Sequence, residues 1–234
     1  DGDYDVAGSY VYWVWPEPYN QTAFFSLENL GNQNSPDFQP ANWLPWAYTY
    51  VPNFYFSAGD ITGDGYTDIA YGRGRNLWLL QNNAGSVFSC DYSYFENLNQ
   101  LGSHATQELV DLNSDGLLDM IVNDSALAHL AAFENVGGPT TPSWTMNNQL
   151  IEGLDISANY IRAAHLNRDN LVDLVAIIGQ GHLAGFLNVG SLSTPYFVYD
   201  STIFADLSGQ QFLYYDLADL DGDGDDVILY NYNG

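Results

Sequence analysis

Short apolar stretches, separated by turn-forming residues, recur along the whole chain. They are rich in β-branched or aromatic residues and are bounded by Gly, Asn or Asp, a pattern that predicts β-strands. One set of four reads NYIRAAHL (159–166), LVDLVAII (171–178), HLAGFLNV (182–189) and YFVYD (196–200). No stretch combines a 3.6-residue apolar period with helix caps, so helix should be nearly absent.

An acidic loop of nine residues repeats between these stretches. It reads DITGDGYTD at 60–68, DLNSDGLLD at 111–119 and HLNRDNLVD at 165–173. A copy one residue short, DLDGDGDD, stands at 219–226, and DGDYD at 1–5 fits the second half of the same loop. The closing acidic residues of the copies are Asp5, Asp68, Asp119, Asp173 and Asp226.

A second marker has the same period. Asn29, Asn82, Asn135 and Asn188 are each 53 residues apart, and three of them open an Asn-x-Gly sequence that leads to a Pro and an aromatic residue. Two unrelated markers with one period establish an internal repeat, and four short strands per repeat are typical of β-propeller blades. A β-sandwich is the alternative, but a sandwich does not need a fixed period.

The expected fold is therefore all-β, with blades of four antiparallel strands in about four repeats of roughly 53 residues and incomplete blades at both ends. We assign residues 1–234 to a single β-propeller domain or segment. Because the chain starts inside one loop and stops after the strand that follows the last, we expect a slice of a longer propeller or a subunit whose open ends pair with other chains. The expected repeats are about 1–59, 60–110, 111–164, 165–218 and a partial one at 219–234.

The charge narrows the range of partners. The chain has 29 Asp and Glu against 4 Lys and Arg, a formal net charge of −25, while its 46% hydrophobic content indicates a folded protein. Nucleic acid, anionic lipid and acidic polysaccharide are poor partners for such a surface, because they normally require clustered Lys and Arg. Bound cations are the simplest way to offset the self-repulsion.

The acidic loops predict calcium sites. Acidic, amide or hydroxyl side chains recur at loop positions 1, 3, 5 and 9, usually with Gly at position 6, and calcium takes six to eight hard oxygen ligands. His165 and Asn170 weaken the third loop, because a neutral imidazole is a poor calcium ligand. The alternative is an Asx-turn hairpin that needs no metal. We expect two to three Ca²⁺ sites, with ligands from Asp60, Thr62, Asp64, Tyr66 (carbonyl), Asp68, Asp111, Asn113, Asp115, Leu117 (carbonyl), Asp119, Asn167, Asp169, Asp173, Asp219, Asp221, Asp223 and Asp226.

The loop and the strand after it, as in DGLLDMIV and GDGYTDIAYG, resemble the FG-GAP (VCBS-type) repeat, and FENVGGPTTPSW and FLNVGSLSTPYF resemble its second half. The resemblance extends over essentially the whole chain. It implies that strand A precedes the loop, that strands B, C and D follow it, and that calcium braces the A–B hairpin. It also implies a propeller of about seven blades, as in integrin α-subunits, fungal lectins and some polysaccharide lyases. Both binding proteins and enzymes belong to this family, so the fold does not settle the function.

Candidate recognition residues are aromatic. A long first B–C connection and a later aromatic-dense segment present Trp13, Trp15, Tyr19, Trp43 and Trp46, which could bind a ligand or pack between blades. Asn20 and Asn123 open N-glycosylation triplets. The four His share no metal-binding spacing, and no nucleophile elbow or phosphate-binding loop is present, so we expect no enzymatic activity.

Three functions remain open. We expect first an extracellular or cell-surface calcium-binding propeller that acts as a structural, adhesive or assembly module through protein–protein contacts or self-assembly. The alternative is a lectin-like module that binds neutral carbohydrate through aromatic clefts. The second alternative is a non-catalytic segment of a secreted polysaccharide-active enzyme. No apolar run is long enough to insert in a membrane.

Overall fold

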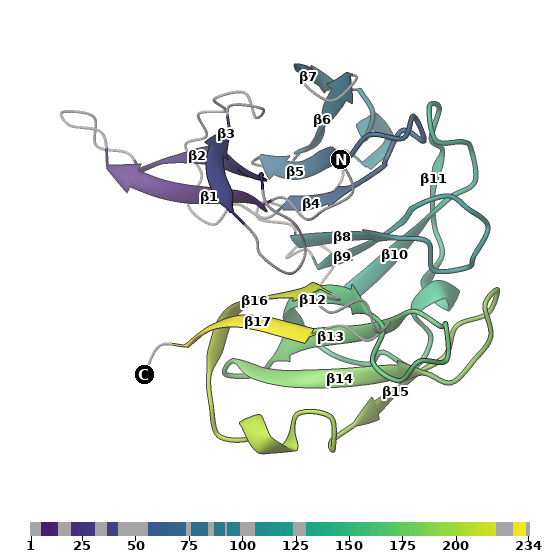
Figure 1. Ribbon diagram of the computed structural model, residues 1–234. Coiled ribbons are helices and arrows are strands. Elements are labelled where there is room, and N and C mark those ends of the chain that lie inside the picture. Colours follow the sequence, from purple (N-terminus) through teal and green to yellow (C-terminus); the bar gives the residue numbers. More distant parts are fainter. Residues whose placement is uncertain are drawn as a thin grey trace.

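The computed structural model describes residues 6–13, 20–30, 37–41, 56–73, 76–83, 87–91, 93–98, 106–123, 130–218 and 227–232. These residues form an all-β structure of seventeen strands and three short 3₁₀ turns (Figure 1). The turns are η1 (Glu96–Leu98), η2 (Asn148–Ile151) and η3 (Ala205–Leu207). Within the described ranges, no helix has the length and apolar character needed to cross a membrane.

Three sheets have four antiparallel strands each, paired in chain order. The first contains β4 (Phe56–Gly59), β5 (Asp68–Arg73), β6 (Asn76–Asn83) and β7 (Val87–Asp91). The second contains β8 (Thr106–Val110), β9 (Asp119–Asn123), β10 (Leu130–Asn135) and β11 (Trp144–Met146). The third contains β12 (Ala158–Ala164), β13 (Asp173–Ile178), β14 (His182–Asn188) and β15 (Phe197–Asp200).

Two smaller sheets flank these three among the described residues. One has β1 (Val6–Trp13), β2 (Asn20–Asn29) and β3 (Phe38–Ala41), and the other has β16 (Phe212–Ala218) and β17 (Val227–Tyr232). In the sequence repeat, β1 comes directly after the acidic residues 1–5, which is the position of strand B. β16 comes directly before the acidic residues 219–226, which is the position of strand A. In the sheets of β4–β7, β8–β11 and β12–β15, one strand precedes the acidic loop and three follow it.

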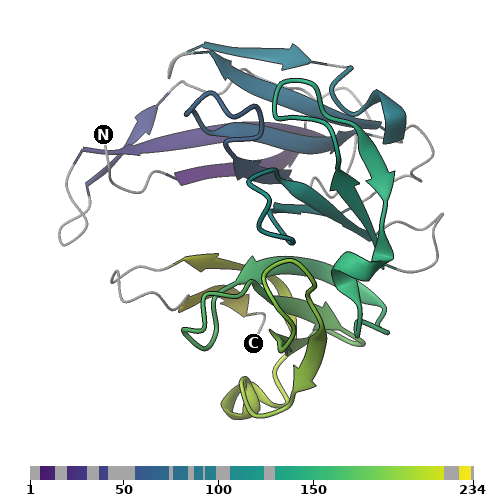
Figure 2. The same cartoon turned by 90° about the vertical axis from the view of Figure 1, so that its right-hand side faces the viewer.

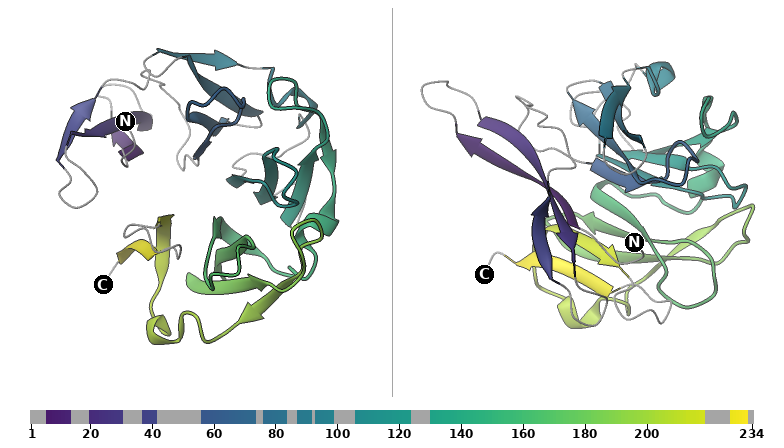
Figure 3. Two further views of the ribbon diagram at one scale, coloured as in Figure 1. Left: turned by 45° about the vertical axis from the view of Figure 1, so that its right-hand side comes forward. Right: turned by 45° about the horizontal axis from the view of Figure 1, so that its top comes forward.

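The sheets follow one another around a common centre (Figure 3, left). The first strands lie inward, where β4 contacts β8, β8 contacts β12 and β12 contacts β16. The last strands β7, β11 and β15 lie on the outside (Figure 3, left). Figure 2 shows the same succession from another side, with the green and yellow C-terminal strands below the blue N-terminal ones.

The apolar core lies between successive sheets. In β13, Leu174 and Ala176 face the sheet of β8–β11, whereas Val175 and Ile177 face β16. In β9, Met120 and Val122 face the sheet of β4–β7, and Ile121 faces the other way. A strand that is buried on both faces needs apolar residues at every position, which explains the continuous apolar runs of β9 and β13 in the sequence.

The four strands predicted at 159–166, 171–178, 182–189 and 196–200 are observed as β12 to β15. Their ends differ by no more than two residues. The two-residue differences fall on either side of the acidic loop, whose polar side chains bind backbone groups that a strand ladder would otherwise use.

Candidate functional site

The three described acidic loops have one shared conformation. Position 4 has a positive φ in each, at Gly63 (70°), Ser114 (57°) and Arg168 (58°). Position 6 does as well, at Gly65 (89°), Gly116 (85°) and Asn170 (62°). Asn is the residue after Gly that best tolerates the left-handed region, so the loop at 165–173 keeps the fold of the others despite its altered sequence.

The Asp that closes each loop is a buried hydrogen-bond acceptor. Asp68 is fully buried, and its Oδ2 accepts hydrogen bonds from Ile61 N at 3.1 Å and Thr62 N at 3.0 Å. Asp119 Oδ2 accepts from Leu112 N at 3.1 Å, and Asp173 Oδ2 accepts from Leu166 N at 2.9 Å. One carboxylate oxygen of each closing Asp therefore holds the entrance of its own loop.

The second oxygen of each closing Asp bonds the Asn of the other sequence marker. Asp68 Oδ1 accepts from Asn82 N at 2.8 Å, Asp119 Oδ1 from Asn135 N at 3.0 Å and Asp173 Oδ1 from Asn188 N at 2.8 Å. The two periodic markers are thus in direct contact in every described repeat. The sequence signal for this contact was the nearly constant spacing of 14, 16 and 15 residues between them.

The marker Asn in turn shapes the next hairpin. Asn135 Oδ1 accepts from Gly137 N at 3.2 Å and from Ser143 N at 3.1 Å. Asn188 Oδ1 makes the same pair of bonds in the following repeat. A Cβ at Gly137 would collide with the backbone of Thr141 and Ser143, so the Asn-x-Gly sequence is required by this close approach.

Most of the other polar side chains of the loops accept hydrogen bonds from loop amides, whereas the Thr62 hydroxyl donates to Asp68 Oδ2 at 3.1 Å. Asp60 binds Asp64 N at 3.0 Å and Gly65 N at 2.9 Å, one with each carboxylate oxygen. Asp111 repeats this with Asp115 N at 3.1 Å and Gly116 N at 2.9 Å. At position 5, Asp64, Asp115 and Asp169 each bind the amide two residues on. At position 3, Asn113 and Asn167 do the same with Asp115 N and Asp169 N.

The candidate ligands of the two complete loops, at 60–68 and 111–119, fit calcium because all are carboxylate, amide, hydroxyl or carbonyl oxygens. Within the described part of the chain, no three His, Cys, Asp or Glu side chains lie together in a metal-binding arrangement. The loop at 60–68 gathers Asp60, Thr62, Asp64 and Asp68, with Tyr66 at the seventh position. The predicted ligands Asp219, Asp221, Asp223 and Asp226 lie outside the described residues.

Burial raises the pKa of all three closing carboxyl groups, outweighing the hydrogen bonds that lower it. The pKa of Asp119 rises to about 7 from its ordinary 3.8. Between these values Asp119 holds more of its proton in the folded protein than in the unfolded chain, so its contribution to stability is greatest in acid and falls as pH rises toward 7. In EDTA we expect a higher melting temperature at pH 5 than at pH 7, and a smaller difference in Asp119→Asn. A melting temperature that increases from pH 5 to pH 7 would contradict this.

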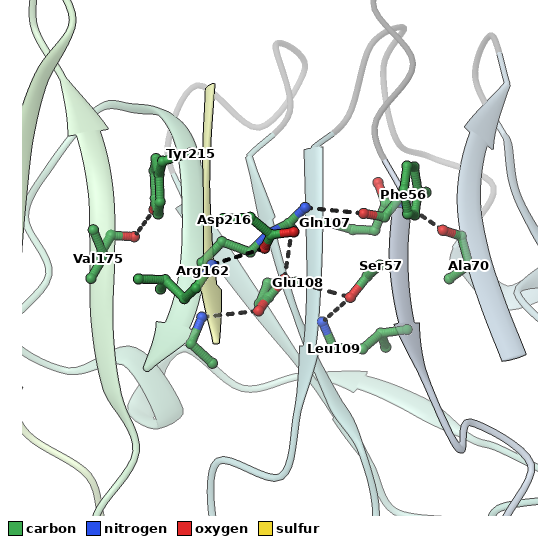
Figure 4. Close-up of polar contacts among 12 residues, drawn as sticks. Phe56, Ser57, Ala70, Gln107, Glu108, Leu109, Arg162, Val175, Tyr215 and Asp216 are labelled. Carbon is green, nitrogen blue, oxygen red and sulfur yellow. Dashed lines mark hydrogen bonds and ion pairs between the residues drawn. The ribbon is translucent and has the colours of Figure 1, made fainter. Parts of the chain in front are cut away.

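A second polar cluster joins the inner strands of neighbouring sheets (Figure 4). Glu108 of β8 accepts from Arg162 Nη1 of β12 at 2.7 Å and from Ala163 N at 2.9 Å. Arg162 Nη2 donates to Phe56 O of β4 at 3.1 Å, and its guanidinium lies 4.5 Å from the centre of the Tyr160 ring. Burial raises the pKa of Glu108, against the Arg162 charge and hydrogen bonds that lower it.

One feature of the sequence points to this cluster. Arg162 is one of only four cationic residues, counting Lys and Arg, and it lies in an apolar stretch. Its partner Glu108 is 54 residues away on another sheet, and the repeat does not reveal that pairing. The cluster ties three successive sheets together at their inner strands.

A surface pocket lies beside the third four-stranded sheet. It has a volume of about 210 Å³ and is bounded by the start of β14, the end of β15 and the segment through η3. The lining residues are His182, Leu183, Tyr199, Asp200, Ser201, Phe204, Ala205, Leu207, Ser208 and Gly209. Sequence reasoning missed this pocket, because its two sides are formed by segments 16 or more residues apart with no shared motif.

The predicted aromatic ligand-binding residues are mostly outside the described part. Trp13 ends β1 and pairs with Asn20 at the start of β2, but only their backbone is described. Trp15, Tyr19, Trp43 and Trp46 lie outside the described residues. The side chain of Asn123, the second predicted glycosylation site, is half-buried at the end of β9 and donates to Ala158 O.

Comparison with known proteins bears on the fold. No family model and no curated protein sequence matches the chain. Among solved structures, the chain is similar to a lectin of Agrocybe aegerita that specifically recognises non-reducing terminal N-acetylglucosamine, with 17% sequence identity and a TM-score of 0.50. The likeness extends over 95% of this chain and 60% of the lectin. It shows a shared arrangement of antiparallel sheets.

Proposed function

We propose that the chain is a β-propeller module that binds neutral carbohydrate and performs no catalysis. The observation that carries the proposal is the likeness of 95% of the chain to a structure whose protein recognises a terminal sugar. The arc of four-stranded sheets around one centre supports the propeller. The charge of −25 disfavours anionic ligands, which leaves neutral glycans as the class of sugar that suits the surface.

Affinity chromatography tests this function. The purified chain is applied to columns of immobilised N-acetylglucosamine, galactose and mannose at pH 7 and physiological salt. We expect retention on at least one column and elution by the free sugar of that column. A chain that passes all three unretarded, while a known lectin is held, would remove the support for the proposal.

Calcium is the proposed cation of the complete loops. The proposed ligands are the oxygens of Asp60, Thr62, Asp64 and Asp68 in one loop and the corresponding ones at 111–119 in the next. The support is the donor type and the acidic excess, which a bound cation would offset. A cation that binds only the folded state stabilises it by mass action.

We therefore expect EDTA at pH 7 to lower the melting temperature, and an excess of CaCl₂ to restore it. Differential scanning fluorimetry at constant ionic strength measures the change, with NaCl in place of CaCl₂ as the control. Because the closing Asp residues are held by backbone amides, the chain should still unfold cooperatively in EDTA. An identical melting temperature with and without EDTA would contradict the proposal that the loops bind calcium.

One observation favours protein–protein contact as a second function. The residue after the marker Asn is apolar and exposed in three repeats: Leu30 by 61%, Val136 by 56% and Val189 by 60%. Near Val189 the surface also exposes Leu192, Tyr196 and Val198. An exposed apolar residue repeated at one position of three blades suits an assembly surface, in keeping with the predicted extracellular structural module.

Sedimentation velocity distinguishes this second function. Association that depends on concentration and is lost in Val189→Ser would support it. A monomer at every concentration, with or without calcium, would argue against self-assembly and leave carbohydrate binding unaffected.

A further inference from the structure

The β14–β15 hairpin carries four apolar residues on one face. Leu187 of β14 pairs with Val198 of β15. Two residues further along the chain from Leu187, Val189 N donates to Tyr196 O at 2.8 Å. Residues two apart in a strand point to the same side, so both pairs lie on one face of the hairpin. Val189 is 60% exposed, Tyr196 46% and Val198 43%, and Leu187 is half-buried. These four residues are the hairpin patch.

The opposite side of the hairpin belongs to the core. Asn188 and Phe197, which pair with each other between the two apolar pairs, are 3% and 1% exposed. Asn188 N donates to Asp173 Oδ1 at 2.8 Å, and Phe197 N donates to Glu152 O at 2.8 Å. The bond to Glu152 occupies the outer edge of β15 at Phe197, so a partner strand cannot pair with the edge there. A partner would have to approach the face that carries the hairpin patch.

The same four positions are mostly polar in the other hairpins that join a third and a fourth strand of the repeat. The strand register and the backbone bonds identify the equivalent positions in three further sheets among the described residues. Only the sheet of β12–β15 has four apolar residues there, so the hairpin patch is particular to that sheet. Each of the other sheets has one apolar residue and three polar ones: Glu134, Val136, Ser143 and Thr145; Gln81, Asn83, Val87 and Ser89; and Glu28, Leu30, Asp37 and Gln39.

Packing between sheets does not account for the hairpin patch. The patch lies on the side of the sheet that carries Leu183, which packs against the buried cluster at β16. In the preceding sheet, Val136 is on the same side as Ala132, which faces the complete sheet of β12–β15, and Val136 is still 56% exposed. The ends of these hairpins therefore extend beyond the cover of the next sheet. Apolar residues are not needed there for the fold, and four of them on one hairpin indicate a partner outside the chain.

The charge of the chain selects the kind of partner. The chain has 29 Asp and Glu against 4 Lys and Arg, and one of these cations, Arg162, is held in the buried ion pair with Glu108. A second copy would bring a like charge of −25 and few cations, which opposes contact between copies. In the loop at 165–173, which is bonded to the hairpin, Arg168 stands against Asp169 and Asp173. A positively charged partner is attracted to such a surface and oriented by it.

We propose that the hairpin patch binds a basic protein segment, whose apolar side chains cover Val189, Tyr196 and Val198 while its Lys and Arg residues face the acidic surface around them. The two pairs of the patch follow one another at about 7 Å along the strands, which leaves room for one or two apolar side chains of the segment. Apolar contacts at the centre with charged groups at the rim are the usual anatomy of a protein interface. The proposal rests on the second proposed function, protein–protein contact, and names its partner and its place.

Isothermal titration calorimetry with synthetic peptides at physiological salt tests the proposal. The probes are an amphipathic Leu/Lys peptide, a Leu/Glu peptide of the same length and Leu spacing, and a Ser/Lys peptide that shows what charge alone contributes. We expect the Leu/Lys peptide to bind, the Leu/Glu peptide not to bind and the Ser/Lys peptide to bind at least tenfold more weakly than Leu/Lys. The double variant Val189→Ser, Val198→Thr should weaken binding of the Leu/Lys peptide at least tenfold. Val136→Ser is the matched control, because Val136 is also exposed (56%) but lies on the hairpin of the preceding sheet, and it should leave binding unchanged.

Other results would overturn the proposal in distinguishable ways. Equal affinity of the parent chain and the double variant for the Leu/Lys peptide would overturn the location. Preference for the Leu/Glu peptide would overturn the charge of the partner. Self-association of the chain that is lost in Val189→Ser would assign the patch to a second copy, so the inference would fail while protein–protein contact would stand. Binding of neither Leu peptide, together with a monomer at every concentration, would overturn both.

Discussion

Replacing Arg162 with methionine is expected to lower the free energy of unfolding by about 3–5 kcal/mol. The change leaves the carboxylate of Glu108 buried without its counter-charge: the two side chains are only 14% and 10% exposed, and their atoms lie 2.7 Å apart. It also removes the bond from Arg162 Nη2 to Phe56 O, which links β12 to β4. Urea denaturation followed by tryptophan fluorescence measures the loss.

Two variants control this prediction. Asp216→Asn removes the other carboxylate near Arg162, which lies 3.9 Å away and is 74% exposed, so it should cost no more than about 1 kcal/mol. The double variant Glu108→Gln, Arg162→Met leaves neither partner of the buried pair charged and should regain part of the loss. If Arg162→Met proved as mild as Asp216→Asn, the buried pair would not be what holds the inner strands together.

Replacing Asp119 with alanine is expected to cost about 2–5 kcal/mol, because Leu112 N and Asn135 N both lose their acceptor, at roughly 1–3 kcal/mol for each buried group. Asp119 is fully buried, and its two bonds measure 3.1 Å and 3.0 Å. The same change separates the loop from the third strand of its sheet. Thermal and urea unfolding in EDTA measure the effect without any contribution from a bound cation.

Asp115→Ala is the matched control within the same loop. Asp115 is exposed and accepts only exposed hydrogen bonds, from Leu117 N at 2.8 Å and from Asn113 Nδ2 at 3.1 Å, so its loss should cost under about 1 kcal/mol. We expect Asp173→Ala, at the equivalent position one repeat later, to lower the free energy of unfolding as much as Asp119→Ala does. Similar small losses at Asp115 and Asp119 would show that the closing Asp is not the main link between loop and sheet.

The repeat made most of the fold predictable. Apolar runs such as 171–178 are continuous because the strand is buried on both faces, and the turn residues around them mark its ends. The loop could be predicted in the same way, because position 6 needs a residue that adopts a positive φ, as Gly116 and Asn170 do. Both features depend on residues close together in the chain.

The contacts between repeats could not be predicted in this way. No feature of the sequence near Glu108 or Arg162 predicts their ion pair, because the pair forms only where two sheets meet at their inner strands. The pocket depends likewise on His182 and Tyr199 being brought together by the β14–β15 hairpin. The closing Asp was predicted as a metal ligand, and its bond to the marker Asn became visible only once both strands were placed.

Binding to a printed glycan array is the most direct test of the central claim, that the chain recognises neutral carbohydrate. The array should include neutral glycans with terminal N-acetylglucosamine, galactose, glucose and mannose, and sialylated and sulfated forms of the same backbones. The account predicts binding to one group of neutral glycans that share a terminal sugar, with weaker signals for the acidic forms. Binding to the acidic forms alone, or to no glycan while a control lectin binds, would contradict it.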